Sequence, residues 1–253
     1  MVEAIPAVVL GIIVVFWMAD WPAQANWLDP QEKKFLAEQY AHEQAAKAAV
    51  KNYNVGQALF DPEVWKLCLA YFLWITVFWG FTYWMPSVLK ELSGWSNAFI
   101  GQVFAAAMLV SLVASAYTGH SSSKRNEKRW HGALHMFLAA IAIGAGAFVH
   151  APWPYSLLMT MAAVGTYAPM SVWWSYPTTF LSGSAAAGAI GLINSMGNLG
   201  GFAGPYITGW IKNTTGSFDG AMVYLSLSLA AAGLLMLTMR RRIRENSIDA
   251  GPA

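Results

Sequence analysis

Long apolar runs separated by polar stretches dominate this chain. Seven of the runs approach the ~20 residues that a helix needs to cross a bilayer. They cover Val2–Ala19, Val64–Met85, Ala98–Tyr117, Gly132–Val149, Tyr155–Tyr176, Ala187–Ile211 and Ala221–Met239. Backbone polar groups in lipid must be satisfied within the protein, so each run is predicted to form a helix. The pattern predicts an all-α integral membrane protein with seven transmembrane helices.

One long polar segment, residues 20–63, separates the first run from the other six. Its middle, Asp29–Lys51, is rich in Ala, Glu, Gln and Lys, and Asp29-Pro30 is a plausible helix start. We expect a transmembrane helix over 1–19, a central loop over 20–63, a six-helix body over 64–239 and a tail over 240–253.

The composition supports a membrane location. Only 11% of the residues are charged, 57% are hydrophobic and 14% are aromatic, whereas soluble domains carry about 25% charged residues. The single cysteine, Cys68, excludes an internal disulfide. Nothing in the composition or charge suggests a nucleic-acid partner.

The basic residues predict the orientation. Thirteen of the 15 Lys and Arg residues fall on one side of an alternating seven-helix path, and only Lys90 and Lys212 fall on the other. By the positive-inside rule the long loop and the C-terminus are cytoplasmic and the N-terminus is outside. The first run lacks the basic start of a signal peptide, which favours a spanning helix.

The segment Asn194–Phe218 combines small residues with amides. Gly197 and Gly201 are four residues apart, as are Gly200 and Gly204, and this spacing lets helix backbones approach closely in lipid. Asn194 and Asn198 are costly in hydrocarbon, so they are expected to face a protein interior or a water-filled path.

Five segments of the chain resemble the major facilitator superfamily, and within it the anion:cation symporter family of organic-acid and sugar-acid permeases. The similar segments are EAIPAVVLG, DWPAQANWLDPQEKKFL, YWMPSVLKELSGWSNAFIGQVFA, GHSSSKRNEKRWH and YPTTFLSGSAAAGAIGLINSMGNLGGFAGPYITGWIKNTTGSF. They match helix six through the helix ten to eleven segment of such a transporter. The resemblance implies one helix plus the six-helix C-terminal half of a twelve-helix bundle, without the N-terminal half.

The resemblance also implies a function. Members of this family move a small organic anion, such as a sugar acid or an aromatic carboxylate, together with a proton by alternating access. Similar sugar-acid transporters contact substrate hydroxyls from a Ser and a Trp on helix ten and an Asn on helix eleven. By this resemblance Ser171, Trp174 and Asn194 are candidate substrate-binding residues.

Three further residues are candidates by their position. Asn198 lies one turn after Asn194 on the same helix face, and Trp79 and Tyr83 are four residues apart on the second apolar run. Each has a simpler alternative, because Asn residues often bond neighbouring helices and aromatic residues near helix ends often anchor the membrane interface.

Two features depart from a complete symporter of this kind. Ser123 and Lys124 stand where the family usually has Asp and Arg, which puts efficient conformational cycling in doubt. No charged residue lies in the middle of a run between Val64 and Met239, and transport of an anion with a proton needs such groups. We therefore expect no transport by the isolated chain. The alternative function is a non-transporting fragment, or a subunit that packs with a separate N-terminal half.

No enzyme, metal or cofactor site is expected. His131 and His135 are four residues apart, but no third metal ligand lies near them. The glycine-rich NLGGFAG lacks the preceding strand of a nucleotide-binding loop. No nucleophile–base set is placed for catalysis at membrane depth. The expected location is the inner (plasma) membrane.

Overall fold

The structure is a computed structural model that describes residues 4–49, 55–177 and 183–239. The chain divides into two compact units, Met1–Asn52 and Tyr53–Ala253, which are described separately below. The expected tail 240–253 lies outside the described residues. Within the described ranges all regular structure is helical, as predicted.

The first unit contains an apolar helix and a polar helix. Its elements are α1 (Ala4–Trp17), the short 3-10 turn η1 (Pro22–Gln24) and α2 (Pro30–Ala49). The Asp29 carboxylate accepts the Gln31 N–H at 2.6 Å, and the Glu32 carboxylate accepts the Asp29 N–H at 3.1 Å. These reciprocal bonds satisfy free N–H groups at the helix start, so the predicted polar helix begins where its sequence indicates.

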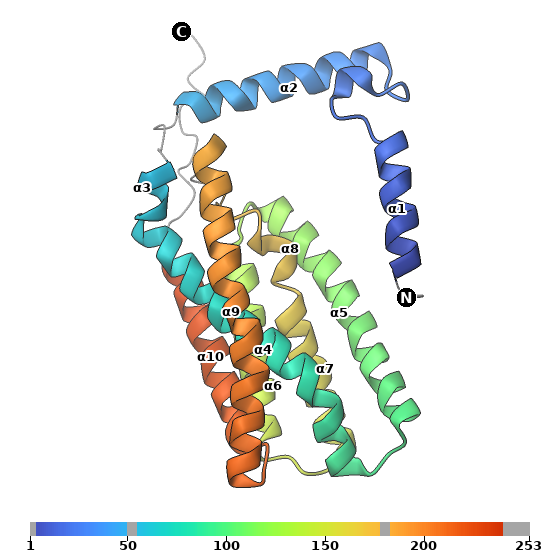
Figure 1. Cartoon of the computed structure of the whole chain (residues 1–253), viewed down its shortest axis with the longest axis vertical. Helices are drawn as coiled ribbons and strands as arrows, with labels where there is room; N and C mark the ends of the chain where they lie inside the picture. The colour runs from blue at the N-terminus through green and yellow to red at the C-terminus, as the bar shows by residue number, and fades with distance from the viewer. Residues whose placement is uncertain (1–3, 50–54, 178–182, 240–253) are drawn as a thin grey trace. The chain divides into compact units, whose positions relative to one another are not determined.

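The second unit is a helical bundle (Figure 1). Its helices are α3 (Val55–Leu59), α4 (Pro62–Ser93), α5 (Asn97–Arg125), α6 (Arg129–Gly146), α7 (Pro152–Tyr167), α8 (Met170–Trp173), α9 (Gly183–Thr215) and α10 (Asp219–Thr238). Each of the last six apolar runs lies on one or two of these helices. The prediction of one continuous helix over Tyr155–Tyr176 is wrong, because the chain breaks at Ala168-Pro169 between α7 and α8.

Three described helices, α4, α5 and α10, are long and apolar enough by length and composition to cross a membrane. The apolar α1 is shorter at 14 residues, and α6 and α7 have 18 and 16. The 33-residue α9 is long but rich in glycine and interrupted by amides. The number of seven transmembrane helices therefore stays a prediction.

The central helix of the bundle is α4, which packs against α9, α10 and α7. Its closest partner is α9, and glycines on both helices make the contact. A Cβ added at Gly200 would collide with the Phe72 carbonyl oxygen, and one at Gly204 with the Thr76 carbonyl oxygen. On the facing side, a Cβ at Gly80 would lie 3.4 Å from the Gly204 backbone. The glycine spacing thus correctly predicts a close approach of two helix backbones.

This contact predicts that a Gly→Ala substitution changes the stability in opposite directions at two positions of α9. Gly200→Ala forces the α4 backbone away and should destabilise the bundle by about 1–3 kcal/mol. Gly191→Ala adds a methyl group where nothing lies within 4 Å, and should stabilise α9 by about 0.5–1 kcal/mol.

Thermal unfolding of both variants in detergent, followed by size-exclusion chromatography, measures the difference. Equal melting temperatures for the two variants would show that α4 and α9 do not approach through Gly200.

Candidate functional site

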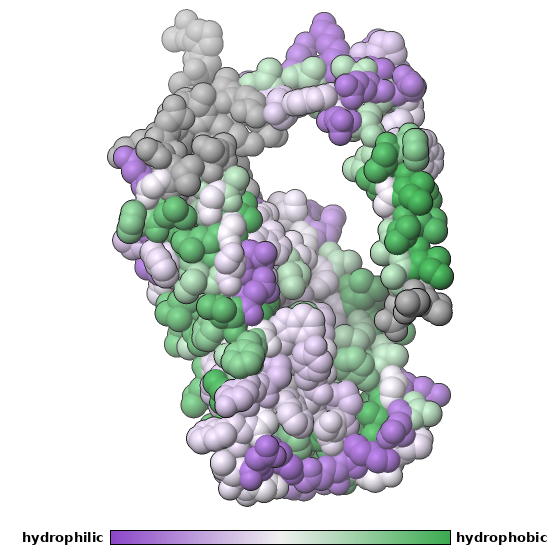
Figure 2. Space-filling model, viewed as in Figure 1, coloured by the Kyte–Doolittle hydropathy of each residue, from purple (hydrophilic) through white to green (hydrophobic). Residues whose placement is uncertain are grey.

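The two asparagines of α9 lie on an exposed face of that helix. The Asn198 Nδ2 donates to Asn194 Oδ1 at 3.0 Å, so the two amides bond to each other. Figure 2 shows hydrophilic residues interrupting a paler surface partway along α9. Among the described residues the pair makes no bond to a neighbouring helix, and it does not lie in the interior of this bundle. Whether it faces a protein interior or a water-filled path in a complete transporter stays a prediction.

The candidates of α4 lie beside this face. Gly201 follows Asn198 by one turn, and its added Cβ would lie 2.9 Å from Trp79 Cδ1 and 3.3 Å from Trp79 Nε1. The Trp79 ring is 5.6 Å from that of Tyr83, and both side chains are exposed. The structure therefore brings Trp79 and Asn198 to neighbouring turns of two packed helices.

Tyr71, a residue that the sequence analysis missed, connects Trp174 to the same surface. The half-buried ring of Trp174 meets the Tyr71 ring edge-on at 5.2 Å. Tyr71 also lies so close to α9 that a Cβ added at Gly197 would collide with its ring. Gly197 lies in the α9 turn that carries Asn194 and Asn198, so Tyr71 contacts both Trp174 and this turn.

Ser171 is placed differently from the other candidates. It is exposed, and its Cβ lies 3.4 Å from the Cβ position of Gly119 on α5. Its hydroxyl donates to the Ala168 carbonyl oxygen at 2.8 Å. The side chain thus lies against α5, while Trp174 lies against α4.

Two further aromatic residues adjoin the candidate surface. Tyr71 precedes Trp79 by eight residues on α4, but its side chain is buried in the core. Tyr167 lies at the end of α7, where its hydroxyl is 2.9 Å from Thr82 Oγ1 and its ring is 4.6 Å from Phe78. No sequence spacing indicated Tyr167.

The candidate surface is uncharged. Its polar groups are amides, hydroxyls and indole N–H groups, and between Val64 and Met239 no charged residue lies at the middle of a described helix. Such a surface can hydrogen-bond hydroxyl and carboxylate oxygens and stack against apolar parts of a solute. It cannot neutralise an anion by itself.

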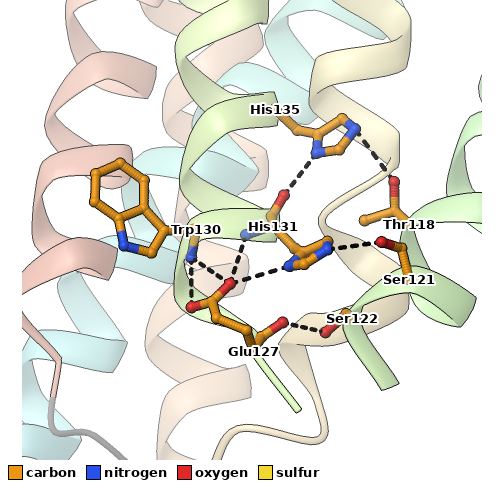
Figure 3. Close-up of polar contacts among 7 residues, drawn as sticks. All are labelled: Thr118, Ser121, Ser122, Glu127, Trp130, His131 and His135. Atoms are coloured by element: carbon orange, nitrogen blue, oxygen red, sulfur yellow. Dashed lines mark hydrogen bonds and ion pairs between the residues drawn. The ribbon is translucent and has the colours of Figure 1, made fainter. Parts of the chain in front are cut away.

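A second polar cluster lies at the turn between α5 and α6 (Figure 3). The Glu127 carboxylate accepts the N–H groups of Trp130 at 2.9 Å and His131 at 3.2 Å, and lies 3.0 Å from His131 Nδ1. His131 Nε2 lies 3.0 Å from the hydroxyl of Ser121 on α5. The Glu127 carboxylate only accepts, so His131 Nδ1 carries a proton.

The second histidine repeats this arrangement one turn later. His135 Nδ1 donates to the His131 carbonyl oxygen at 2.6 Å, and its Nε2 lies 3.2 Å from Thr118 Oγ1. The two histidines, which share a spacing suited to metal ligands, thus connect α5 to α6.

Two opposing effects act on the pKa of the Glu127 carboxyl. Burial raises the pKa of its carboxyl, but the hydrogen bonds from Trp130 and His131 lower it, and the net pKa lies below the ordinary value. The carboxylate also lies at the N-terminus of α6, where free N–H groups favour a negative charge.

Comparison with known proteins identifies the family. The model of the Major Facilitator Superfamily matches residues 1–205. The chain belongs to this superfamily. It is an integral membrane protein, consistent with the apolar helices described above.

Several curated relatives are transporters by name. Two putative tartrate transporters of Agrobacterium vitis are 34% and 35% identical to the chain, over 100% and 95% of its length. A quinolone resistance transporter of Acinetobacter baumannii is 28% identical over 88% of the chain. The chain spans 58%, 53% and 51% of the lengths of these superfamily members, about half in each case.

The lowered pKa of Glu127 predicts a pH-dependent contribution to stability. Because the folded-state pKa is below the unfolded one, the contribution is full above the ordinary glutamate range (about 4.3). It is lost as the pH falls through the folded-state value. Glu127→Gln removes the negative charge at the N-terminus of α6 and should therefore cost about 0.3–1 kcal/mol at pH 7, and progressively less as the medium is acidified.

Melting temperatures of the two proteins between pH 7 and pH 3.5 measure this difference. Glu38→Gln, at an exposed position of α2, is the control and should change stability little at either pH. If the melting-temperature difference caused by Glu127→Gln stays constant across this pH range, the predicted contribution of the lowered Glu127 pKa to stability is contradicted.

Proposed function

We propose that this chain forms one wall of a membrane path for a small organic anion, which moves together with protons by alternating access. The observation that supports this most is the exposed asparagine pair beside Trp79. After their mutual bond, the two amides retain three N–H donors and the Asn198 carbonyl oxygen. Lipid tails offer no partner to these groups, whereas an oxygen-rich solute does.

The proposed substrate class is a hydroxylated carboxylate, for which tartrate is the natural first probe. Two similar proteins are named as putative tartrate transporters. Asn194 and Asn198 donate to its hydroxyl or carboxylate oxygens, while Trp79, Tyr83 and Trp174 provide aromatic walls. Ser171 contributes from the α5 side of the same path.

Charged residues are needed to neutralise the substrate anion and to carry the proton. The described helices have no charged residue at mid-depth, so these residues must lie outside this surface. We propose that they belong to a second transporter half, with which this chain assembles in the inner membrane. The chain spans about half of its curated relatives, and the part of the relatives outside the match is the natural candidate for that half.

Transport should depend on this second half. We expect no uptake of labelled tartrate above background by vesicles that contain this chain alone. Co-expression with the N-terminal half of the Agrobacterium vitis relative should give saturable uptake that an inward proton gradient increases. Uptake by the chain alone would contradict the need for a second half, and absence of uptake in both would contradict the proposed substrate.

Asn194→Leu tests the asparagine pair directly. Loss of one solute hydrogen bond should raise the KM for tartrate roughly tenfold. Asn213→Leu is the matched control, because Asn213 is exposed at the far end of the same helix and should leave the KM unchanged. Equal KM values for the two variants would show that Asn194 does not bind tartrate.

The orientation is proposed from the distribution of basic residues, with the α5–α6 turn cytoplasmic. Asn97 and Lys124 are exposed near opposite ends of α5, and the native Cys68 is buried. In a Cys68→Ala background, an impermeant thiol reagent outside the cell should label Asn97→Cys, and should reach Lys124→Cys only after permeabilisation. The reverse pattern would overturn the orientation.

A further inference from the structure

The break between α7 and α8 leaves backbone carbonyls without their usual donors. In a continuous helix the N–H groups of Met170 and Ser171 would donate to the carbonyls of Thr166 and Tyr167. Pro169 has no N–H to donate. Here the Ser171 N–H donates to the Ala168 carbonyl oxygen at 3.2 Å instead.

Two side chains from neighbouring helices donate to these carbonyls. Trp74 Nε1 on α4 donates to the Thr166 oxygen at 2.8 Å, and Ser115 Oγ on α5 donates to the Tyr167 oxygen at 3.2 Å. Trp74 and Thr166 are fully buried, so water does not compete for the first of these bonds. Together they fix the last turn of α7 from two sides.

The next turn of the chain carries two candidate substrate-binding residues, Ser171 and Trp174. Trp74 packs on Trp173 with ring centroids 5.5 Å apart, and Tyr71 stacks on Trp173 at 5.4 Å. The fully buried Trp173 Nε1 has no hydrogen-bond partner in the described part of the chain. Packing from α4, and not a bond made by its own indole, therefore holds Trp173 in place.

We propose that Trp74 and Ser115 are positioning residues for substrate binding, which hold the α7–α8 break open at the angle that directs Trp174 toward α4 and Ser171 toward α5. The role of the turn in binding rests on the proposed function. The two hydrogen bonds replace those of a continuous helix, so removing either donor allows the turn to change its geometry.

Amide hydrogen exchange of the full chain in lipid nanodiscs tests the structural part without a substrate. Trp74→Phe keeps a large ring but removes the N–H, and exchange of residues 170–176 should become roughly tenfold faster. Trp84→Phe is the matched control, because Trp84 Nε1 on the same helix donates to the Pro205 carbonyl oxygen at 3.0 Å. It should leave this segment unchanged.

Ser115 provides a milder variant and a conservative rescue. Ser115→Ala removes the hydroxyl and should also speed exchange of the segment, whereas Ser115→Thr keeps the hydroxyl and should restore it. In vesicles that contain the complementary N-terminal half, Trp74→Phe and Ser115→Ala should raise the KM for tartrate several-fold. Ser115→Thr and Trp84→Phe should keep the KM of the unsubstituted chain.

The outcomes separate the two proposals. Exchange in Trp74→Phe and Ser115→Ala equal to that in Trp84→Phe would overturn the positioning role. Faster exchange with an unchanged KM would also overturn it, because the turn would then not serve binding. Lack of tartrate uptake by the unsubstituted assembly contradicts the proposed function alone, since the exchange comparison still decides whether Trp74 and Ser115 hold the turn.

Discussion

The backbone contact between α4 and α9 is the constraint on which the other features of the bundle depend. In lipid there is no hydrophobic drive between helices, so association depends on close packing. Gly200 and Gly204 allow α9 to touch the carbonyls of α4, and this fixes the register of the two helices. A shift of α9 by one residue would place larger side chains against α4 and turn the asparagines away from Trp79.

This register also explains the position of the aromatic residues. Gly197 leaves room for Tyr71, and Gly201 leaves room for Trp79. Tyr71 then meets Trp173 and Trp174, which connects α9 to the turn after α7. The Trp173 indole N–H has no hydrogen-bond partner among the described residues, which costs about 1–3 kcal/mol. The ring contacts with Tyr71 and Trp74 must offset this cost. The candidate site is therefore a consequence of packing around α4.

The sequence predicts the helices of this bundle well, because the apolar runs and the polar loops differ strongly. The glycine spacing of α9 also predicts its contact. It does not predict the break at Pro169, because Pro86 and Pro205 lie inside α4 and α9 without ending them. What distinguishes Pro169 is its tertiary surroundings, because Trp74 and Ser115 come from distant parts of the chain and donate hydrogen bonds to the freed carbonyl oxygens.

The same reason limits the prediction of the site. Asn198 and Trp79 belong to runs more than a hundred residues apart, and only the glycine register brings their helix turns together. Ser171 and Trp174 are three residues apart in the sequence, yet they lie against different helices. Tyr71 was missed because an aromatic residue in an apolar run carries no signal of its own without the neighbouring α9 glycines.

The α5–α6 turn shows what the departure at Ser123 changes. Ser123 is exposed and carries no carboxylate, and the acid at this turn is Glu127, which binds the first turn of α6 and His131. Ser121 and Thr118 extend these bonds to α5. Separating α5 from α6 at this turn would break the bonds of both histidines at once. The proline break between α7 and α8 differs from this turn, because there the hydrogen-bond ladder is interrupted inside an apolar run, and a change in geometry breaks fewer backbone bonds than in a continuous helix.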